Sequence, residues 1–147
     1  MKSPVTLPIA AFAILLSMMA ATAWADGEAG GPEPVPSKIV RLVESEQYDR
    51  AIPQLEQFVR VNKKSADGWN WLGYSQRSTG DLDGALKSYK KALRLDRKHL
   101  GANEYLGELY VMRGQMKKAN KQLKKLAKYC GDCEQHQKLA EVIRNSQ

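Results

Sequence analysis

The chain repeats itself with a constant period, without a gap, from residue 32 to residue 133. When the sequence is divided into three equal blocks, 32–65, 66–99 and 100–133, residues of similar type fall into the same columns. The clearest column holds Ala51, Ala85 and Ala119, and two others hold Leu55, Tyr89 and Leu123, and Phe58, Ala92 and Leu126. A period of about 34 residues is typical of proteins built from small stacked units, because one unit alone cannot bury its apolar face. The chain is therefore expected to fold as a linear array of repeats.

Each block contains the pattern of two helices joined by a tight turn. Apolar residues recur at helical spacing twice within a block, and a polar or glycine break separates the two runs. The breaks fall at Glu46-Gln47, Gly80-Asp81 and Gly114-Gln115. Small residues at equivalent positions, such as Gly73 and Gly107, allow two helices to approach closely. Each unit is therefore predicted to be a helix–turn–helix, and the fold class is predicted to be all-α.

Several residues of the middle block follow the consensus of a known helical repeat. They are Trp69, Leu72, Gly73, Ala85, Tyr89 and Ala92. On these residues the chain, from about residue 36 to its C-terminus, resembles the tetratricopeptide repeat (TPR) family. The resemblance implies a right-handed α-solenoid of three TPR units, at about 32–65, 66–99 and 100–133, within a domain that spans 37–147. The opening helix of the first block departs from the consensus, since Lys38 and Ile39 stand there in place of the leucine and glycine.

A further helix is predicted after the third block, over residues 134–147. Leu139, Val142 and Ile143 lie on one side of it at helical spacing. Asp132 is expected to cap its first turn, together with Gln135 three residues later. Since a repeat array needs a terminal element that covers its last apolar face, this segment is predicted to be a capping helix.

Residues 1–25 have the three-part layout of a secretory signal peptide. Lys2 precedes an apolar run from Ile9 to Met19, and the small residues Ala23 and Ala25 predict cleavage by a signal peptidase after Ala25. The apolar run is shorter than the ~20 residues that a membrane-spanning helix needs, which disfavours the alternative of a retained anchor. We therefore expect an exported, periplasmic protein of bacterial type. Residues 26–36 are rich in glycine, proline and acidic residues and are predicted to form a flexible linker.

The composition is that of an ordinary basic domain and gives no sign of catalysis. Hydrophobic residues make up 43% and charged residues 27%, close to the globular average, and the formal net charge is +7. The sequence contains no glycine-rich phosphate loop, no HExxH motif and no Gly-x-Ser-x-Gly motif. His99 and His136 are interpreted as surface or packing residues rather than general bases. The chain is therefore predicted not to be an enzyme, and no cofactor is expected.

The two cysteines, Cys130 and Cys133, form the one motif that suggests chemistry. In an exported protein this spacing favours a structural disulfide, and Gly131 between them would ease the tight geometry. A redox-active pair is one alternative, although the strand and helix pattern of thioredoxin-like proteins is missing. A metal site with His136 as a third ligand is another, but no fourth ligand is evident in the sequence.

A stripe of lysines runs along the second helix of the third block. Its members are Lys117, Lys121, Lys124 and Lys128, and they are called the lysine stripe below. Their helical spacing places them on one side of that helix. The structural interpretation is a solvated outer face, and the functional alternative is an anionic partner such as the surface of the cell envelope. Nucleic acid is not an expected partner, because no aromatic residues are interleaved with the lysines.

The TPR resemblance also implies a binding site, since the first helix of each TPR unit lines a concave groove. Carried over by alignment, the groove residues are Val40, Val43, Glu44, Asn70, Tyr74, Arg77, Ser78, Glu104, Glu108, Val111 and Met112. Asn70 and Arg77 are expected to hold the backbone of a bound peptide. Tyr74 and Met112 are expected to contact an apolar side chain. Three aromatic residues are interpreted as packing residues: Trp69, Trp71 and Tyr105. The alternative is that the groove positions are merely exposed helix residues.

Taken together, these features predict a non-catalytic scaffold or adaptor that binds another protein, or a peptide segment of one, in its concave groove. Two alternatives belong to other classes. The first is a periplasmic thiol–disulfide or metal-handling protein that acts through Cys130 and Cys133. The second is a basic adaptor that uses the lysine stripe to bind an anionic membrane surface.

Overall fold

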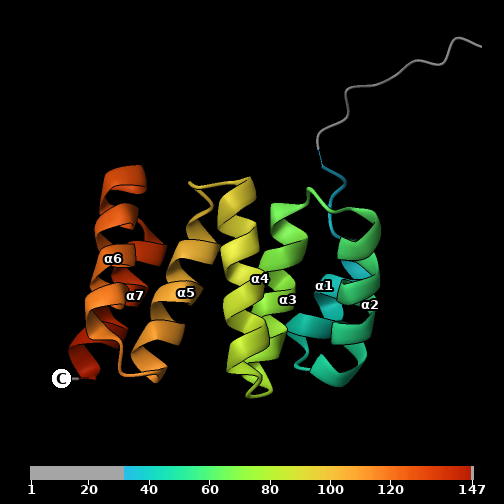
Figure 1. Cartoon of the computed structure of the whole chain (residues 1–147), viewed down its shortest axis with the longest axis horizontal. Coiled ribbons are helices and arrows are strands. Elements are labelled where there is room, and N and C mark those ends of the chain that lie inside the picture. Colours follow the sequence, from blue (N-terminus) through green and yellow to red (C-terminus); the bar gives the residue numbers. More distant parts are fainter. Residues whose placement is uncertain (1–31, 147) are drawn as a thin grey trace, which may run out of the picture.

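The computed structural model describes residues 32–146, which form seven helices and no strand. The helices are α1 (Ser37–Glu44), α2 (Tyr48–Val61), α3 (Ala66–Ser78), α4 (Leu82–Leu95), α5 (Leu100–Met112), α6 (Met116–Cys130) and α7 (Glu134–Asn145). They follow one another along the longest axis of the molecule, from α1 and α2 at one end to α6 and α7 at the other (Figure 1). The all-α solenoid predicted from the sequence is confirmed.

Two predictions concern the N-terminal part of the chain, which the structure describes only from residue 32. The signal peptide (residues 1–25) and the first part of the linker (residues 26–31) lie outside the described residues. Among the helices of residues 32–146, none has the length and hydrophobicity of a membrane-spanning segment.

The helix boundaries keep the period of the sequence. The first residues of α3, α5 and α7 are Ala66, Leu100 and Glu134, each one full period after the last. The second helices α2, α4 and α6 begin at Tyr48, Leu82 and Met116, again at intervals of one period. Because α7 packs against α5 and α6, it occupies the place of the first helix in a fourth, incomplete unit.

The first unit has a shortened opening helix. α1 has 8 residues, whereas α3 and α5 have 13 each. Pro34 and Pro36 stand where the additional turn would be, and each disfavours the helical conformation in the residue before it. Between them, Val35 is half-buried against the N-terminal part of the core. Val35 thus ties this end of the predicted linker to the repeat array.

The turn inside each unit contains one residue with a positive φ angle. These residues are Glu46 (58°), Gly80 (87°) and Gly114 (67°). In each turn the next residue donates its backbone N–H to a carbonyl oxygen in the last turn of the preceding helix, at 2.7–2.8 Å. This Schellman arrangement satisfies carbonyl groups at a helix end and requires a left-handed residue. Since glycine adopts that conformation without a steric penalty, Glu46 is the strained member of the three.

Replacing Glu46 by glycine is expected to raise the free energy of unfolding by about 0.5–1 kcal/mol. The gain is the strain removed from the turn, reduced by the greater freedom of glycine in the unfolded chain. Urea unfolding followed by circular dichroism measures it. Gly114→Ala is the opposite control, because an added Cβ meets no atom within 4 Å but takes a φ of 67°. The free energy of unfolding of Gly114→Ala is expected to fall by about 1 kcal/mol. A lower free energy of unfolding in Glu46→Gly would contradict this account of the turn.

The core consists of two clusters of buried side chains, one in the first unit and α3, the other from α4 to α7. Two glycines let the helices approach closely, as the sequence predicts. A Cβ added at Gly73 would lie 2.8 Å from the ring of Tyr89. A Cβ added at Gly107 would lie 2.4 Å from the side chain of Leu139. These two contacts fix α4 on α3 and α7 on α5.

The N-terminal cap of α7 differs from the prediction. The cap residue is Cys133, and no side chain accepts a hydrogen bond from the first turn. Asp132 lies one residue too early to cap this helix, and its Oδ1 atom lies 3.4 Å from Nδ1 of His136. The expected capping arrangement of Asp132 with Gln135 is therefore wrong.

His99 caps α5 and joins it to α3. Its Nδ1 atom accepts the backbone N–H of Ala102 at 3.1 Å, and its Nε2 atom lies 3.0 Å from Oδ1 of Asp67. Because Nδ1 accepts, the neutral tautomer with a proton on Nε2 satisfies both contacts. His99 thus has a structural role between two units, which agrees with its interpretation as a surface or packing residue.

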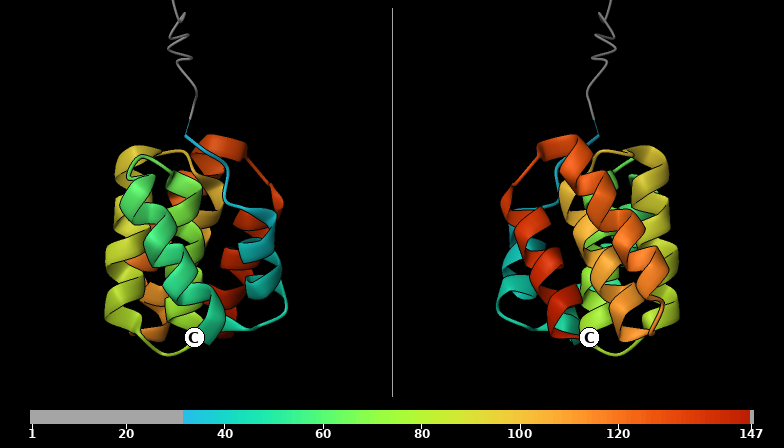
Figure 2. Two further views of the ribbon diagram at one scale, coloured as in Figure 1. Left: turned by 90° about the vertical axis from the view of Figure 1, so that its right-hand side faces the viewer. Right: turned by 90° about the vertical axis from the view of Figure 1, so that its left-hand side faces the viewer.

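The helices are arranged so that the array has two different sides. α1 and α7, from the two ends of the chain, lie on the same side of the stack, and α4 lies on the other (Figure 2). The first helices of the units therefore line the inner side, and the second helices form the outer side.

Candidate functional site

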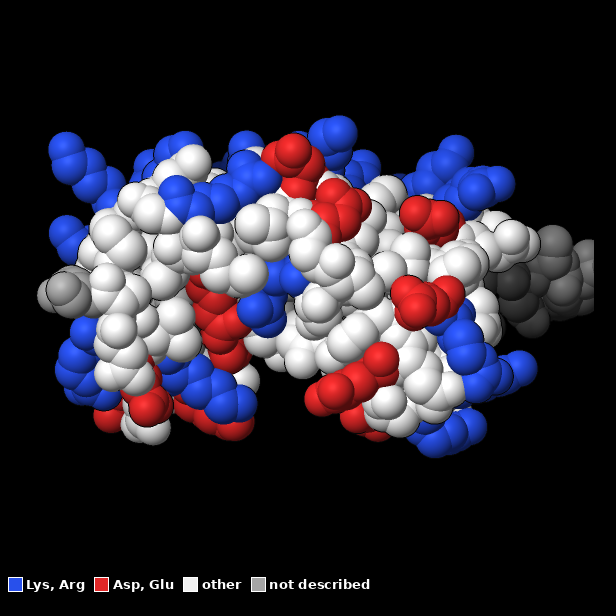
Figure 3. Space-filling view, turned by 90° about the horizontal axis from the view of Figure 1, so that it is seen from below, with Lys and Arg blue, Asp and Glu red and all other residues white. Residues whose placement is uncertain are grey.

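The inner side of the array is hollowed. Viewed along the helices, the surface recedes between the α1 end and the α7 end, and acidic and basic side chains meet in the hollow (Figure 3). We call this hollow the concave groove and define it by Tyr74 and Arg77 on α3 and Glu104 and Glu108 on α5.

Arg77 lies at the centre of the concave groove. Its Nη2 atom lies 3.0 Å from Oε2 of Glu108, and both side chains are 17% exposed. The guanidinium carbon lies 5.4 Å from the centre of the Tyr74 ring and 5.6 Å from that of Tyr105, within the range of cation–π contacts. Nε also donates to the hydroxyl of Tyr89 at 3.4 Å. Arg77 therefore holds α3, α4 and α5 together through one side chain.

Aromatic side chains surround Arg77 and form a continuous row. The ring centres of Tyr48 and Tyr74 are 6.2 Å apart, and those of Tyr74 and Tyr105 are 5.1 Å apart. Trp71 meets the Tyr74 ring edge to face at 6.1 Å. These four side chains are half-buried, so each keeps part of its surface accessible. The row offers a surface on which an apolar or aromatic side chain can pack.

The two carboxyl groups on α5 have shifted proton affinities. Burial raises the pKa of Glu104 to about 7, with a further upward contribution from the charge of Glu108. Lys138 on α7 lowers this pKa, Glu134 raises it, and Arg77 lowers it. Burial also raises the pKa of Glu108, against the lowering effects of Arg77 and Lys138. One arginine thus faces two carboxyl groups, which leaves the groove short of positive charge.

Replacing Glu104 by glutamine is expected to raise the free energy of unfolding by about 1–3 kcal/mol at pH 8. Between about pH 4.5 and 7, the folded protein holds a proton on Glu104 that the unfolded chain releases. The wild type therefore loses stability as the pH rises through this range. The variant lacks this loss, so the difference fades toward pH 4.5.

Thermal unfolding between pH 4.5 and pH 8 measures the effect of Glu104→Gln. Glu44→Gln is the matched control, since Glu44 is exposed at the end of α1. A difference between Glu104→Gln and the wild type that does not vary with pH would contradict the assignment.

The structure distributes the expected groove residues over three environments. It brings together Tyr74, Arg77 and Glu108 at the centre of the groove and buries Glu104, which is 3% exposed, beneath them, so Glu104 is corrected from a surface contact to a buried charge. It leaves Glu44, Ser78 and Met112 exposed and Val40 and Val111 half-buried. It buries Val43, which is 2% exposed and packs in the N-terminal core, so Val43 is corrected from a contact residue to a core residue.

Asn70 is also buried, whereas the sequence predicts that it holds a peptide backbone. Its Oδ1 atom has no hydrogen-bond partner among the described residues, and its amide nitrogen faces Gly101 of the next unit. The Asn70 side chain therefore belongs to the interface between α3 and α5 rather than to the open surface of the groove.

The groove contains three aromatic residues that the sequence analysis does not assign to it: Tyr48, Trp71 and Tyr105. Trp71 and Tyr105 pack between helices, as predicted, but each also contacts Tyr74. Tyr48 lies on a second helix, and only its difference from the aliphatic Leu82 and Met116 at equivalent positions could have indicated it. The repeat alignment therefore finds the charged part of the groove more readily than the aromatic part.

Cys130 and Cys133 are joined by a disulfide bond, with their Cα atoms 5.6 Å apart. The bond closes the short loop between α6 and α7. His136, considered as a third metal ligand, points its Nδ1 atom at Asp132 instead.

The lysine stripe lies on the solvent side of α6. Lys117, Lys121, Lys124 and Lys128 each present their side chains outward. Two further lysines of the helix contact the protein instead. Nζ of Lys118 lies 5.5 Å from the centre of the Tyr110 ring, and Nζ of Lys125 donates to Oε1 of Gln122 at 3.2 Å.

Comparison with curated proteins finds similarity over part of the chain. Heat shock protein STI1 of Saccharomyces cerevisiae is 34% identical over 64 residues, which is 44% of this chain and 11% of that protein. Tetratricopeptide repeat protein 1 of Schizosaccharomyces pombe is 27% identical over 106 residues, 69% of this chain and 10% of that protein. The chain thus spans about a tenth of the length of these relatives.

Solved structures share the fold at low sequence identity. The type III secretion chaperone SycD of Yersinia enterocolitica, in complex with a peptide of the translocator YopD, superposes with a TM-score of 0.66 and 16% identity, over 75% of this chain and 84% of SycD. The first TPR of Spaghetti (RPAP3), bound to an HSP90 peptide, superposes with a TM-score of 0.67 and 13% identity, over 74% of this chain and 87% of that chain.

Two family models described as tetratricopeptide repeat match residues 39–99 and 76–143, so that together they extend from the first unit to α7. The helix boundaries, the turns and the solved structures agree with them. The chain belongs to the tetratricopeptide repeat family.

Proposed function

We propose that this protein is a non-catalytic scaffold of a bacterial cell envelope that binds a segment of another protein in its concave groove. TPR proteins of this kind serve as interaction adaptors, and similar structures were solved with peptides bound. The location rests on the signal-peptide pattern of residues 1–25 and on the disulfide between Cys130 and Cys133, since disulfides persist in oxidising compartments.

The observation that carries the proposal is the pairing of one arginine with two carboxyl groups beside a row of tyrosines. Arg77 is bound to Glu108, and Glu104 beside them is 3% exposed, so its carboxyl group acts on a cation of the partner from beneath the groove surface. The rings of Tyr74 and Tyr105 would contact an apolar side chain or the face of a guanidinium group. The segment bound here therefore contains a lysine or arginine next to an aromatic or aliphatic residue.

The test is a capture of envelope proteins on the purified protein, in parallel with two variants whose folding is verified by circular dichroism. The groove variant is Tyr74→Ala with Glu104→Gln. The matched control is Lys121→Glu with Lys124→Glu, which changes the lysine stripe. A partner retained by the control and lost from the groove variant supports the proposal. A partner kept by both variants contradicts it.

The affinity of the captured partner provides a second test. A cation bound beside Glu104 favours the ionised carboxylate, so binding is expected to strengthen several-fold as the pH rises from 5.5 to 8. Calorimetric titration across this range measures the effect. Glu104→Gln is expected to remove the pH dependence.

A second function is favoured by the outward position of the whole lysine stripe. We propose that this side of α6 binds an anionic surface, such as lipid headgroups. The protein is then expected to cosediment with anionic vesicles at low salt and to be released at high salt. Vesicle binding that survives Lys121→Glu with Lys124→Glu would contradict the proposal.

A further inference from the structure

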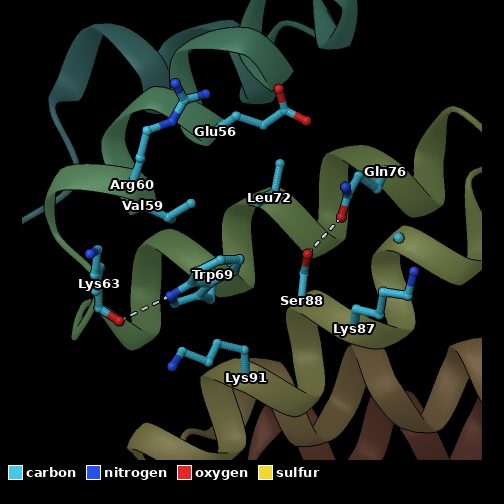
Figure 4. Close-up of a pocket in the computed structure, with 11 residues that line it drawn as sticks. Glu56, Val59, Arg60, Lys63, Trp69, Leu72, Gln76, Lys87, Ser88 and Lys91 are labelled. Atoms are coloured by element: carbon cyan, nitrogen blue, oxygen red, sulfur yellow. Dashed lines mark hydrogen bonds between the residues drawn. The ribbon is translucent and has the colours of Figure 1, made fainter.

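A second hollow lies on the outer side of the array, away from the concave groove. It has a volume of about 800 Å³ and lies between α2 and α4, with α3 as its floor (Figure 4). The floor is apolar and includes Trp69 and Leu72. The indole N–H of Trp69 donates to the carbonyl oxygen of Lys63 at 3.2 Å, which fixes the orientation of the ring. We call this hollow the convex pocket.

The walls of the convex pocket carry an excess of positive charge. Four cations line it: Arg60 and Lys63 from the α2 side, and Lys87 and Lys91 from α4. Glu56 is the one carboxylate among the lining residues. None of the four cations forms an ion pair within residues 32–146. Their charges are therefore available to a partner.

The pocket is open because of residues specific to the first two units. One end is bounded by Gln76 and Ser88, where the serine hydroxyl donates to Oε1 of the glutamine at 2.7 Å (Figure 4). Gly84 also lines the pocket, and its lack of a Cβ makes room for the side chains of Asp81 and Gln76.

The equivalent hollow, one repeat later, lies between α4 and α6 and is filled. Tyr110, Lys118 and Gln122 stand one period after Gln76, Gly84 and Ser88. The Tyr110 and Gln122 side chains are buried, Lys118 lies on the Tyr110 ring, and Lys125 donates to Gln122. The convex pocket is thus not a general property of the repeat but of these particular side chains.

We propose that the convex pocket binds an acidic protein segment, with one aromatic or aliphatic side chain on Trp69 and carboxylates against the surrounding cations. Charge complementarity selects an anionic partner, and the apolar floor selects one with an apolar side chain. A flat membrane surface does not fit, because Trp69 lies at the bottom of a recess. A nucleic acid does not fit either, because successive bases stack on several aromatic side chains and the pocket offers a single tryptophan.

This site goes beyond the function proposed above. The concave groove is acidic and suits a basic segment, whereas the convex pocket is basic and suits an acidic one. Since the two lie on opposite sides of α3, both segments can bind at once. The protein would then join two partners of opposite charge.

The test uses a fluorescent peptide of glutamate and serine around one phenylalanine, added to the purified protein in fluorescence anisotropy. Binding is expected to weaken with salt and to be lost when the glutamates become glutamine. Lys87→Gln with Lys91→Gln is expected to weaken it about tenfold. The matched control is Lys90→Gln with Arg94→Gln, which removes two exposed cations of α4 that do not line the pocket. The control is expected to bind like the wild type, and equal weakening in both variants would overturn the proposal.

Two further measurements locate the bound peptide. Gln76→Tyr with Ser88→Gln introduces two of the three residues that fill the equivalent hollow and is expected to abolish binding while all four cations remain. In NMR spectra the indole N–H signal of Trp69, assigned with Trp69→Phe, is expected to shift on binding. A shift of the Trp71 signal instead, or full binding by the filled variant, would overturn the proposal.

Discussion

Replacing Leu139 by alanine is expected to lower the free energy of unfolding by about 3–4 kcal/mol. Leu139 is 0% exposed, and it is the side chain by which α7 packs against Gly107 of α5. Its removal leaves a cavity between rigid helix backbones, which cannot close without moving α7. Because α7 covers the end of the array, the loss weakens the third unit as well.

The partner substitution Gly107→Ala is expected to cost about 1–3 kcal/mol for the opposite reason. The added methyl group would lie 2.4 Å from Leu139, so the two side chains compete for one space. In the double variant the methyl group enters the cavity left by Leu139→Ala. The loss in the double variant is therefore expected to be smaller than the sum of the single losses by about 1 kcal/mol or more, the scale of coupling between residues in contact.

Urea unfolding of the two single variants and the double variant gives this coupling directly. Gly101→Ala in the same helix is the control, because the nearest atom to its added Cβ lies at an ordinary 3.4 Å. It is expected to leave the stability unchanged or slightly raised. Additive losses in the cycle would show that α7 is not held by this contact.

Replacing Arg77 by alanine is expected to lower the free energy of unfolding by about 3 kcal/mol at pH 8. The variant loses the ion pair with Glu108, the contacts with the Tyr74 and Tyr105 rings and the hydrogen bond to Tyr89. The larger effect comes from the Glu108 carboxyl group, which is left largely buried without its ion-pair partner.

The loss in Arg77→Ala is expected to depend on pH. Arg77 lowers the pKa of both Glu104 and Glu108, so its removal raises both values further above their ordinary value of 4.5. The folded variant then holds protons that the unfolded chain releases, and it loses stability as the pH rises above 4.5. The deficit relative to the wild type is therefore larger at pH 8 than at pH 5.

Thermal unfolding at pH 5 and pH 8 measures this difference. Adding Glu108→Gln to Arg77→Ala is expected to recover part of the stability at pH 8, since the unpaired charge is gone. Arg113→Ala is the matched control, because Arg113 pairs with Asp83, whose side chain is 83% exposed. Because water screens an exposed pair, this ion pair is expected to contribute little to stability. An equal loss in both arginine variants would contradict the central role of Arg77.

The sequence predicts the turns and helix boundaries well because these depend on local interactions. The breaks placed at Gly80 and Gly114 coincide with the residues of positive φ, and Glu46 takes the same conformation in the first unit. The sequence places the cap of α7 at Asp132, one residue before the observed cap Cys133, since several polar residues at a helix start can serve as caps.

The candidate groove is predictable only in part. Alignment finds Tyr74, Arg77 and Glu108, which the structure brings into one cluster. It also places Val43 in the groove, because a helix position that faces a partner in one unit faces the core in another. In the first unit α1 is short, and its valine fills space between α1, α2 and α3 that longer helices would fill differently.

The repeat pattern in the amino-acid chain is enough to specify the period, the helix–turn–helix unit, the family and the charged residues of the inner side, because each of these recurs within about one unit of chain. The burial and raised pKa of Glu104, the aromatic rings around Arg77 and the open outer hollow at Trp69 emerge only when the units are packed together. These properties depend on whether side chains from neighbouring units fill the same space, and the volume left between packed helices is not encoded in any one repeat.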